Sequence, residues 1–394
     1  MLRYMTAGES HGPALVGILD GMPAGLRVDV DSMNRQLTAR QGGHGRGGRM
    51  KIESDAVEIL AGIRGGSTLG SPIAIAIRNR DYENVRALMD PLTGSGPAIT
   101  KPRPGHADYA GALKYRHRDL RNVLERASAR ETAMRVALGE LSRQYLGVFG
   151  VTVVSYVIQI GDVAAGAVRQ MPDSTVISRS PVRCLDPDAE SEMVRAIDAA
   201  KAAGDTLGGV FEILVSGMPV GVGGNRQPYE RLDARLAAAL MSIQTAKAVE
   251  VGEGIASGDY TGSRWHDAFE KRGTHIARTS NRAGGIEGGM SNGEDLLLRA
   301  RLKPLATLMK PLQSVDLSSG EAAPAAIVRS DVCSVPAAAV IGEAMVCLEL
   351  AQAFSEKYGG DSVEELLEHF HASQAGAAQV FPAPSNTSPD ASPT

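Results

Sequence analysis

The chain has 394 residues, of which 43% are hydrophobic and 22% are charged, and its formal net charge is −4. These values are typical of a soluble globular protein with a large core. A slightly acidic chain with 4% aromatic residues lacks the positive charge and the stacking surfaces of a general nucleic-acid-binding protein. Cys184, Cys333 and Cys347 share no metal-type spacing and cannot all pair, so we expect a reducing compartment, the cytoplasm.

No segment of the sequence predicts a membrane anchor. Residues 1–12 lack the layout of a signal peptide. Residues 335–354 form the most apolar stretch, but Glu343 and Glu349 interrupt the roughly 20 apolar residues that a membrane span needs. We therefore expect a buried helix there.

In chain order, strand-like and helix-like segments alternate. Short apolar runs rich in β-branched residues predict strands at 14–19, 73–77, 148–160 and 210–215. Other segments predict helices, at 31–40, 119–145, 191–203, 231–243 and 336–358. An Asn-Gly pair at 292–293, just before the apolar run 296–298, predicts a hairpin. The pattern indicates a mixed α/β (α+β) fold.

The two halves of the chain resemble each other. Residues 21–25 read Gly-Met-Pro-Ala-Gly, and residues 217–221, which lie 196 positions later, read Gly-Met-Pro-Val-Gly. Gly65-Gly66 before the strand at 73–77 is matched by Gly288-Gly289 before the run at 296–298. We expect an internal duplication, with halves at about 8–147 and 204–358 whose helices pack between two sheets. Chance similarity of glycine and proline turns is the alternative.

The sequence predicts one catalytic domain over residues 1–371 and a tail. From residue 372 onward the chain loses its periodicity and becomes rich in proline. We expect residues 372–394 to be disordered and dispensable.

Positive charge is concentrated in two tracts. No acid occurs between Asp31 and Glu53, a segment that carries five cations among five glycines: Arg35, Arg40, Arg46, Arg49 and Lys51. Residues 101–135 carry nine Lys or Arg against four Asp or Glu. Glycine lets main-chain N–H groups approach a ligand, and guanidinium groups match phosphate and carboxylate oxygens. One such tract could equally be a solvated loop, but two favour a small ligand with several negative charges.

The glycines at 43–48 do not indicate a dinucleotide-binding fold. Their spacing is close to G-x-G-x-x-G, but the segment precedes a strand-like run and does not open a helix. The segment remains a good candidate for an anion-binding loop.

Two histidines lie in glycine-rich or proline-rich loops rather than on apolar stripes. His11 lies in Gly8-Glu9-Ser10-His11-Gly12, where imidazole is suited to proton transfer near neutral pH. This motif also matches the G-x-S-x-G nucleophile elbow, although no helix follows Ser10. His106 lies in Lys101-Pro102-Arg103-Pro104-Gly105-His106-Ala107-Asp108, where it could face a leaving phosphate; the alternative is a polar surface loop.

Three further tracts are too polar for a core. Residues 126–132 place Arg126 and Arg130 one turn apart, either as an ion-pair face or, through the small residues between them, as a surface for a flat ligand. Residues 271–289 predict a lid or a binding loop. Residues 303–307 and 329–331 complete the set, in which Asp331 is either a helix N-cap or a base near a cofactor. No histidine and carboxylate pattern predicts a metal site.

Taken together, these motifs resemble those of the chorismate synthase family, and the resemblance runs from residue 8 to about residue 354. It rests on motifs in order at 8–12, 40–49, 103–108, 126–132, 205–209, 281–293, 303–307 and 329–331. The resemblance implies a β–α–β sandwich with central helices between two antiparallel sheets, and a homotetramer in the cytoplasm.

The resemblance also implies the reaction. It is the anti-1,4-elimination of phosphate from 5-enolpyruvylshikimate 3-phosphate to give chorismate, a lyase step of the shikimate pathway in aromatic amino-acid biosynthesis. Reduced FMN (FMNH2) is required, with no net redox change. The sequence leaves open whether an external flavin reductase or an intrinsic NADPH-dependent activity reduces the flavin.

Site residues follow from the same resemblance. His11, His106 and Asp331 are implied as catalytic residues. Five arginines are implied to bind substrate anions: Arg40, Arg46, Arg49, Arg103 and Arg130, of which Arg40 and Arg46 could instead bind a nicotinamide-nucleotide (NADP) phosphate. The implied FMN site comprises Arg126, Ala127, Ser128, Gln244, Thr245, Gly288, Lys303, Pro304, Leu305, Ala306, Thr307 and Arg329.

Two rival functions come from other classes. A Ser10 hydrolase would be labelled at Ser10 by a fluorophosphonate probe. A module that binds anions or nucleic acid through residues 40–49 would show steep salt dependence and indifference to small substrates.

Overall fold

The structure, a computed structural model, describes residues 2–48, 54–166, 168, 170–272, 275–327 and 330–380. Its first sheet has the antiparallel strand order β1 (Arg3–Ala7), β2 (Ala14–Asp20), β6 (Ile73–Arg78) and β3 (Glu58–Ala61). Its second sheet, also antiparallel, has the order β10 (Ala246–Val251), β15 (Leu296–Leu302), β9 (Gly209–Ser216), β7 (Thr152–Ile160) and β8 (Val163–Ala164).

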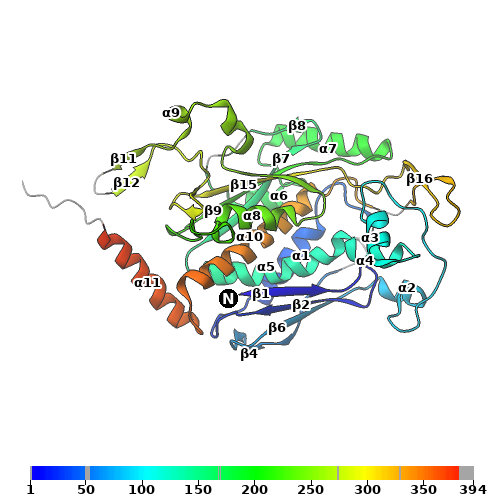
Figure 1. The fold of residues 1–394 in the computed structure, drawn as a ribbon, viewed down its shortest axis with the longest axis horizontal. Coiled ribbons are helices and arrows are strands. Elements are labelled where there is room, and N and C mark those ends of the chain that lie inside the picture. The colour runs from blue at the N-terminus through cyan, green and yellow to red at the C-terminus, as the bar shows by residue number, and fades with distance from the viewer. Residues whose placement is uncertain are drawn as a thin grey trace, which may run out of the picture.

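Helices fill the space between the two sheets (Figure 1). This layer contains α1 (Val30–Gln41), α5 (Thr132–Gly147) and α10 (Val335–Tyr358), and α8 (Leu232–Met241) packs against α10. The predicted fold class, a sandwich of mixed helices and antiparallel sheets, is confirmed.

Side-chain alternation explains how the first sheet covers the helices. In β2, Leu15 and Leu19 are fully buried, whereas Val16 and Ile18 face outward. A strand exposes alternate residues to opposite faces, so β2 presents one apolar face to the helical layer. Gly17 also faces inward, where a Cβ atom would lie 2.5 Å from the sulfur of Met134.

The two long helices of the layer touch closely. A Cβ atom on Gly139 of α5 would lie 2.6 Å from Cα of Ala344 on α10, so only glycine permits this approach. Helix α10 is the one described helix long and apolar enough to cross a membrane, and 89% of its most apolar window is buried within the protein. The expected buried helix is confirmed.

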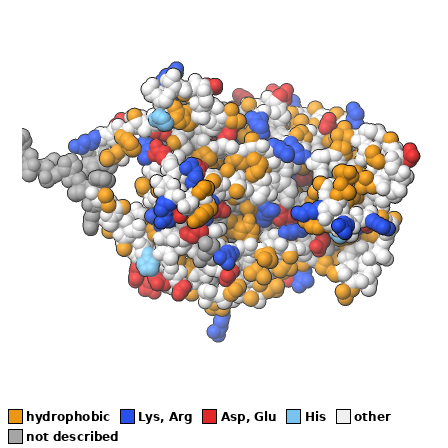
Figure 2. Space-filling model, in the orientation of Figure 1, with side chains coloured by type: hydrophobic (Ala, Val, Ile, Leu, Met, Phe, Trp, Pro, Cys, Tyr) orange, Lys and Arg blue, Asp and Glu red, His pale blue; other side chains and the backbone are white. Residues whose placement is uncertain are grey.

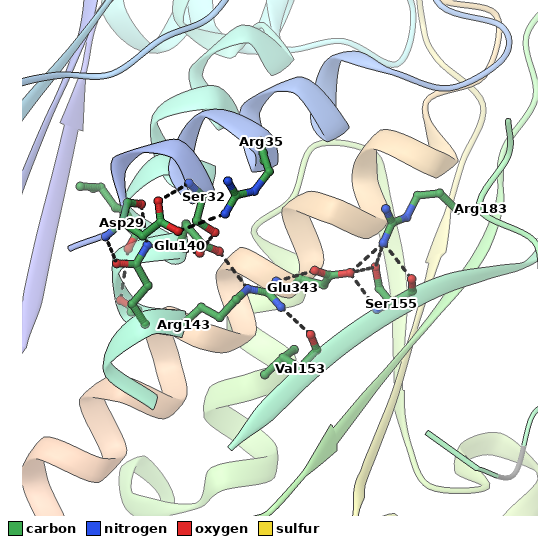
Figure 3. A network of polar contacts seen from close by, with 12 residues as sticks. Asp29, Ser32, Arg35, Glu140, Arg143, Val153, Ser155, Arg183 and Glu343 are labelled. Atoms are coloured by element: carbon green, nitrogen blue, oxygen red, sulfur yellow. Dashed lines mark hydrogen bonds and ion pairs between the residues drawn. The ribbon is translucent and has the colours of Figure 1, made fainter. Parts of the chain in front are cut away.

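A polar network crosses this otherwise apolar layer (Figure 3). Arg143 of α5 is ion-paired with Glu140 of its own helix and with Glu343 of α10. On the other side of Glu343, Arg183 donates to it at 2.8 Å, and Ser155 of β7 donates through both its main-chain N–H and its hydroxyl, at 2.8 and 2.6 Å. The network links both halves of the chain to the second sheet.

The two halves share local geometry beyond their glycines. Two hairpins occupy matching places, β4 (Ile63–Arg64) with β5 (Ser67–Thr68), and β13 (Ile286–Glu287) with β14 (Met290–Ser291). The Thr68 hydroxyl donates to the carbonyl of Pro23 (2.5 Å), and the Ser291 hydroxyl donates to that of Pro219 (2.6 Å). These matches support an internal duplication, which we propose for residues 8–147 and 204–358.

The predicted helix over 119–145 is wrong as one element. The chain forms α4 (Arg121–Ala127), the short helix η2 (Ala129–Glu131) and then α5. Ser128 breaks the helix because its backbone is extended (φ −64°, ψ 143°), and its hydroxyl accepts the N–H of Arg130. Arg126 and Arg130 therefore do not share a helix face.

Two other expectations also need correction. The hairpin turn near residue 292 is formed by Gly288 and Gly289, since Glu287 pairs with Met290. The strand expected from residue 148 begins at Thr152. Residues 372–380 continue helix α11 (Val363–Val380) instead of forming a loose tail, and residues 381–394 lie outside the described part.

The remaining elements are connecting helices and short strands. They are α2 (Tyr82–Met89), α3 (Asp108–Tyr115), α6 (Ser174–Arg179), α7 (Pro187–Ala202), η3 (Pro228–Glu230), η4 (Gly254–Asp259), α9 (Gly262–Trp265), β11 (Phe269–Arg272), β12 (His275–Arg278), β16 (Gln313–Val315) and β17 (Ala322–Pro324).

Candidate active site

Arg40 lies near the end of α1 and is 4% exposed. Its Nε donates to the Thr132 hydroxyl (2.9 Å) and its Nη2 to the carbonyl of Ala129 (2.6 Å). Its Nη1 is buried and has no hydrogen-bond partner among the residues that the structure describes. Burial, followed by the positive charges of Arg46 and Arg130, lowers the pKa of Arg40 to about 9. A buried cation in this position favours an anionic ligand.

Arg130 on η2 is also 4% exposed. Its Nη1 donates to the Asp55 carboxylate (2.7 Å) and its Nε to the side-chain oxygen of Asn79 (2.9 Å). The side-chain nitrogen of Asn79 donates in turn to the carbonyl of Gly12 (2.7 Å). Asn79 thereby ties this predicted substrate-binding arginine to the turn that carries His11.

Arg46 and Asp331 meet across 285 residues of sequence. The Arg46 Nη1 lies 2.6 Å from Asp331 Oδ2, and the main-chain N–H of Gly47 donates to Oδ1 at 2.7 Å. Asp331 is therefore not the N-cap of α10, which is Ser334. Its contacts bring two predicted site residues together at the glycine-rich loop.

His11 is held by Glu125 at the end of α4. The main-chain N–H of His11 donates to Glu125 Oε2 at 2.8 Å, and its ring Nδ1 lies 2.9 Å from Oε1. The ring Nε2 lies 3.8 Å from a carboxylate oxygen of Asp81. The turn is anchored further by the N–H of Ser10, which donates to the Glu125 carbonyl at 3.0 Å.

The surroundings of Ser10 do not form a nucleophile elbow. Residues 8–12 connect the antiparallel strands β1 and β2, whereas an elbow requires a turn from a strand to a helix. Ser10 is 3% exposed, and its hydroxyl lies 3.2 Å from that of Ser128. The hydrolase alternative fails on this geometry.

Arg126 crosses from α4 to the first sheet. Its Nη2 donates to the carbonyl and hydroxyl of Thr6 at 2.9 and 2.8 Å, and its Nη1 donates to the carbonyl of Gly8 at 3.2 Å. These bonds place residues 126–128 beside the end of β1, next to the turn with His11.

His106 belongs to a second, tightly bonded cluster. Its Nδ1 lies 2.5 Å from Asp108 Oδ1. Arg103 donates to both oxygens of Asp108, from Nε at 2.9 Å and from Nη2 at 3.1 Å, and to the Thr307 hydroxyl at 3.0 Å. Burial opposes the charge on Asp108, but the hydrogen bonds from His106 and Arg103 outweigh it and hold the pKa of this carboxyl well below its usual range.

Residues 303–307 join this cluster to a third group of side chains, which contains Gln244 and Thr245. The Lys303 ammonium donates to the carbonyl of Gly105 at 2.8 Å, and the Lys303 N–H donates to the carbonyl of Thr245 at 2.9 Å. Thr245 has a left-handed backbone (φ 77°), which is unusual for a β-branched residue. Burial and then the neighbouring Lys247 lower the pKa of Lys303.

Gln244 completes the connection to η2, because its side-chain nitrogen donates to Glu131 at 2.6 Å. The side-chain oxygens of Gln244 and Thr245 are buried without a hydrogen-bond partner in the described part of the chain. Buried polar atoms of this kind are normally satisfied, so they mark a position for a polar ligand.

Some predicted residues lie outside this assembly. Gly288 lies in the turn of the β13–β14 hairpin, and no contact among the described residues joins it to the clusters above. Arg49 and Arg329 lie outside the described residues. No group of three or more His, Cys, Asp or Glu side chains suited to a metal ion occurs in the described ranges.

Several residues that shape the site were not predicted as site residues. Asp55, Asn79 and Glu125 each bond directly to a predicted residue. Glu125 adjoins Arg126 and Asp55 closely follows the basic tract, but no spacing in the sequence pairs them with their partners. On the face drawn in Figure 2, basic side chains are interspersed with acidic ones and form no continuous basic surface.

Known proteins match nearly the whole chain. A family model described as chorismate synthase matches residues 2–355. The chorismate synthase of Symbiobacterium thermophilum is 52% identical over 383 residues, covering 94% of this chain and 97% of that protein. The chorismate synthase of Desulforudis audaxviator is 53% identical over 380 residues, covering 94% and 96%.

A solved structure also matches. A crystal structure of chorismate synthase superposes with a TM-score of 0.76 at 36% identity, covering 96% of this chain and 99% of that one. With a family match over most of its length and curated relatives at about half identity, the chain belongs to the chorismate synthase family.

Proposed function

We propose that the protein catalyses the anti-1,4-elimination of phosphate from 5-enolpyruvylshikimate 3-phosphate to give chorismate, which makes it a carbon–oxygen lyase of the shikimate pathway. In this step a ring C–H bond and the C–O bond to phosphate break, a C=C bond forms, and a proton and phosphate leave. The observation that carries the proposal is Arg40, whose buried charge is crowded by Arg46 and Arg130. A substrate with one phosphate and two carboxylates would relieve this crowding.

The arginines divide the binding of these anions. Arg40 offers a buried Nη1, and Arg46 and Arg130 add charge beside it while Asp331 and Asp55 hold their side chains in place. Arg103 has committed most of its donors to Asp108 and Thr307, so its contribution is to shape the cluster around His106.

Three residues would handle protons. His106 would protonate the departing phosphate from Nε2, since its Nδ1 is engaged by Asp108. His11 would stabilise or protonate the reduced flavin. Asp331 would accept a proton at its carboxylate, which the ion pair with Arg46 keeps at the glycine-rich loop.

The third group of side chains fits reduced FMN. The buried oxygens of Gln244 and Thr245 would accept hydrogen bonds from the cofactor, and the Lys303 ammonium would face its phosphate. Residues 126–128 and 303–307, with Gly288 and Arg329, would complete the site by resemblance to the family. These residues would hold reduced FMN, whose chemistry there would be transient electron donation without net redox change.

The remaining features of the proposal come from the family. We propose a cytoplasmic homotetramer that receives reduced flavin from an external reductase, or reduces it with NADPH through a nucleotide phosphate bound at Arg40 and Arg46. Three buried free cysteines support a reducing compartment.

An anaerobic assay tests the function. Purified protein would be given chemically reduced FMN and 5-enolpyruvylshikimate 3-phosphate, with oxidised FMN plus NADPH in a parallel arm. Equal release of phosphate and chorismate only with reduced flavin is expected of an enzyme without its own reductase, and activity in the NADPH arm would assign one. Folded protein that forms no chorismate in either arm would refute the proposal.

A further inference from the structure

The contact between Glu125 and His11 determines which nitrogen of the neutral His11 ring carries hydrogen. Glu125 Oε2 accepts the main-chain N–H of His11 at 2.8 Å, and the ring Nδ1 lies 2.9 Å from Oε1 and 3.0 Å from Oε2. Glu125 is 5% exposed, whereas the side chain of His11 is 29% exposed and reaches solvent. The main-chain nitrogen can only donate, and a carboxylate can only accept.

The ring nitrogen must therefore be a donor as well. An ionised carboxylate offers no proton to Nδ1, so the 2.9 Å contact is a hydrogen bond only if Nδ1 carries hydrogen. In the neutral ring the other nitrogen, Nε2, then holds the lone pair. Nε2 points toward Asp81 at 3.8 Å, which is too long for a hydrogen bond but places a second carboxylate on that side.

We propose that Glu125 is a positioning residue that fixes the proton of the neutral His11 ring on Nδ1 and so makes Nε2 the atom through which His11 exchanges protons. The catalytic consequence rests on the proposed function, in which His11 acts at the flavin, but the proton assignment does not. In the His106 cluster a carboxylate oxygen of Asp108 also lies 2.5 Å from Nδ1, but Nη2 of Arg103 lies 3.1 Å from the same nitrogen.

The amide of glutamine replaces this carboxylate only in part. Glu125→Gln keeps the size of the side chain but turns one of the two oxygens into an NH2 donor. If the amide oxygen stays on the main-chain N–H, it keeps the 3.0 Å contact with Nδ1, but the NH2 group takes the 2.9 Å position and can bond the ring there only when the ring proton moves to Nε2. If the amide is reversed, the main-chain N–H of the turn loses its acceptor.

The test compares Glu125→Gln with Glu140→Gln in the full-length enzyme supplied with reduced FMN. Glu140 is 3% exposed, lies on α5 and contacts Ser32 and Arg143 rather than the site, so it is a matched control. We expect Glu125→Gln to lower kcat by about 10²-fold or more with KM little changed, on the scale of a misdirected general acid. We expect kcat of folded Glu140→Gln to stay within about twofold of wild type.

Nitrogen-15 NMR of histidine-labelled protein gives a readout independent of turnover. The chain has eight histidines, and the His11→Gln spectrum identifies the signals of His11 by their loss. In the neutral ring we expect hydrogen on Nδ1 in wild type and on Nε2 in Glu125→Gln.

A neutral wild-type ring with its proton on Nε2 would overturn the proposal even if Glu125→Gln fails to fold. An unchanged kcat in folded Glu125→Gln would overturn the catalytic part. If the protein makes no chorismate at all, the NMR assignment still stands or falls alone, so the two failures are distinguishable.

Discussion

Buried or half-buried arginines occur in two regions of this protein, and their surroundings differ. In the network between the sheets, Arg143 is ion-paired with Glu140 and Glu343, and Arg183 is ion-paired with Glu343 (Figure 3). At the candidate site, Arg40 donates to a hydroxyl and a carbonyl and forms no ion pair with a carboxylate among the described residues. The first region balances its charge within the fold, and the second does not.

The direction of the pKa shifts follows this difference. Burial opposes the charge on Arg143, but nearby Cys347 and the carboxylates of Glu343 and Glu140 outweigh it, and its pKa lies above the usual range. At Arg40 burial prevails and two neighbouring arginines add to it, so the pKa falls to about 9. Removing one partner of a balanced buried pair destabilises a fold, whereas an unbalanced buried charge signals a ligand of opposite charge.

The largest effect is expected at His106, which acts in the proposed catalysis and belongs to neither group of arginines. His106→Ala should lower kcat by about 10²- to 10⁴-fold, because it removes the proposed acid for phosphate departure. KM and the free energy of unfolding should change little, since the bonds of Arg103 to Asp108 and Thr307 remain. Steady-state kinetics and urea unfolding check this, with His117→Ala as the control. Turnover near that of wild type would remove His106 from the mechanism.

Breaking the balanced network should cost stability instead. Glu343→Ala leaves both Arg143 and Arg183 without their shared carboxylate, and removal of one partner from a buried pair typically lowers the free energy of unfolding by about 3–5 kcal/mol. Urea unfolding measures the loss. The protein that remains folded should keep wild-type KM. A loss below about 1 kcal/mol would show that the network does not hold the layers together.

At the candidate site, removing a buried charge should weaken substrate binding rather than stability. Arg40→Met should weaken substrate binding by about 10- to 150-fold, equivalent to the roughly 1.5–3 kcal/mol of a hydrogen bond to a charged group. Stability without ligand should be unchanged or higher, because a buried charge is lost.

Arg143→Met is the matched control for this substitution. It should destabilise the protein but leave the affinity of the folded fraction unaltered. Calorimetry with substrate and urea unfolding without it distinguish the two variants, and a similar loss of stability in both would contradict the comparison.

The sequence predicted the layers, and it proposed most of the candidate site residues, for identifiable reasons. Apolar runs and helical spacing depend on local pattern, so β2, β6, β9 and α10 were predicted closely. The site residues came from ordered motifs, and the structure places Arg46 on Asp331 and Lys303 on Gly105 as parts of one assembly.

What could not be predicted depends on pairing across the chain. Glu125 and His11 are 114 residues apart, and Arg130 and Asp55 are 75 apart, so no local spacing reveals them. The break at Ser128 also escaped prediction, because a single cap bond overrides a continuous apolar pattern.

The smallest effect that we expect tests the balanced pair inside the site. The pKa of Asp108 is lowered in the fold, so its carboxylate stabilises the protein above its ordinary value of 3.8 and loses this effect as pH falls below it. The difference in free energy of unfolding between wild type and Asp108→Asn should thus be constant from pH 6 to 5 and shrink from pH 4 to 3.

Asp295 provides a control of opposite sign. Partial desolvation and the neighbouring Glu294 raise its pKa, so its contribution is present at low pH and is lost as pH rises through the folded value. Wild type should therefore gain stability relative to Asp295→Asn over the same fall in pH. If the differences in free energy of unfolding from wild type shrank together for both variants, general acid unfolding would explain them. Asp108 would then not be a carboxylate that its ion pairs stabilise.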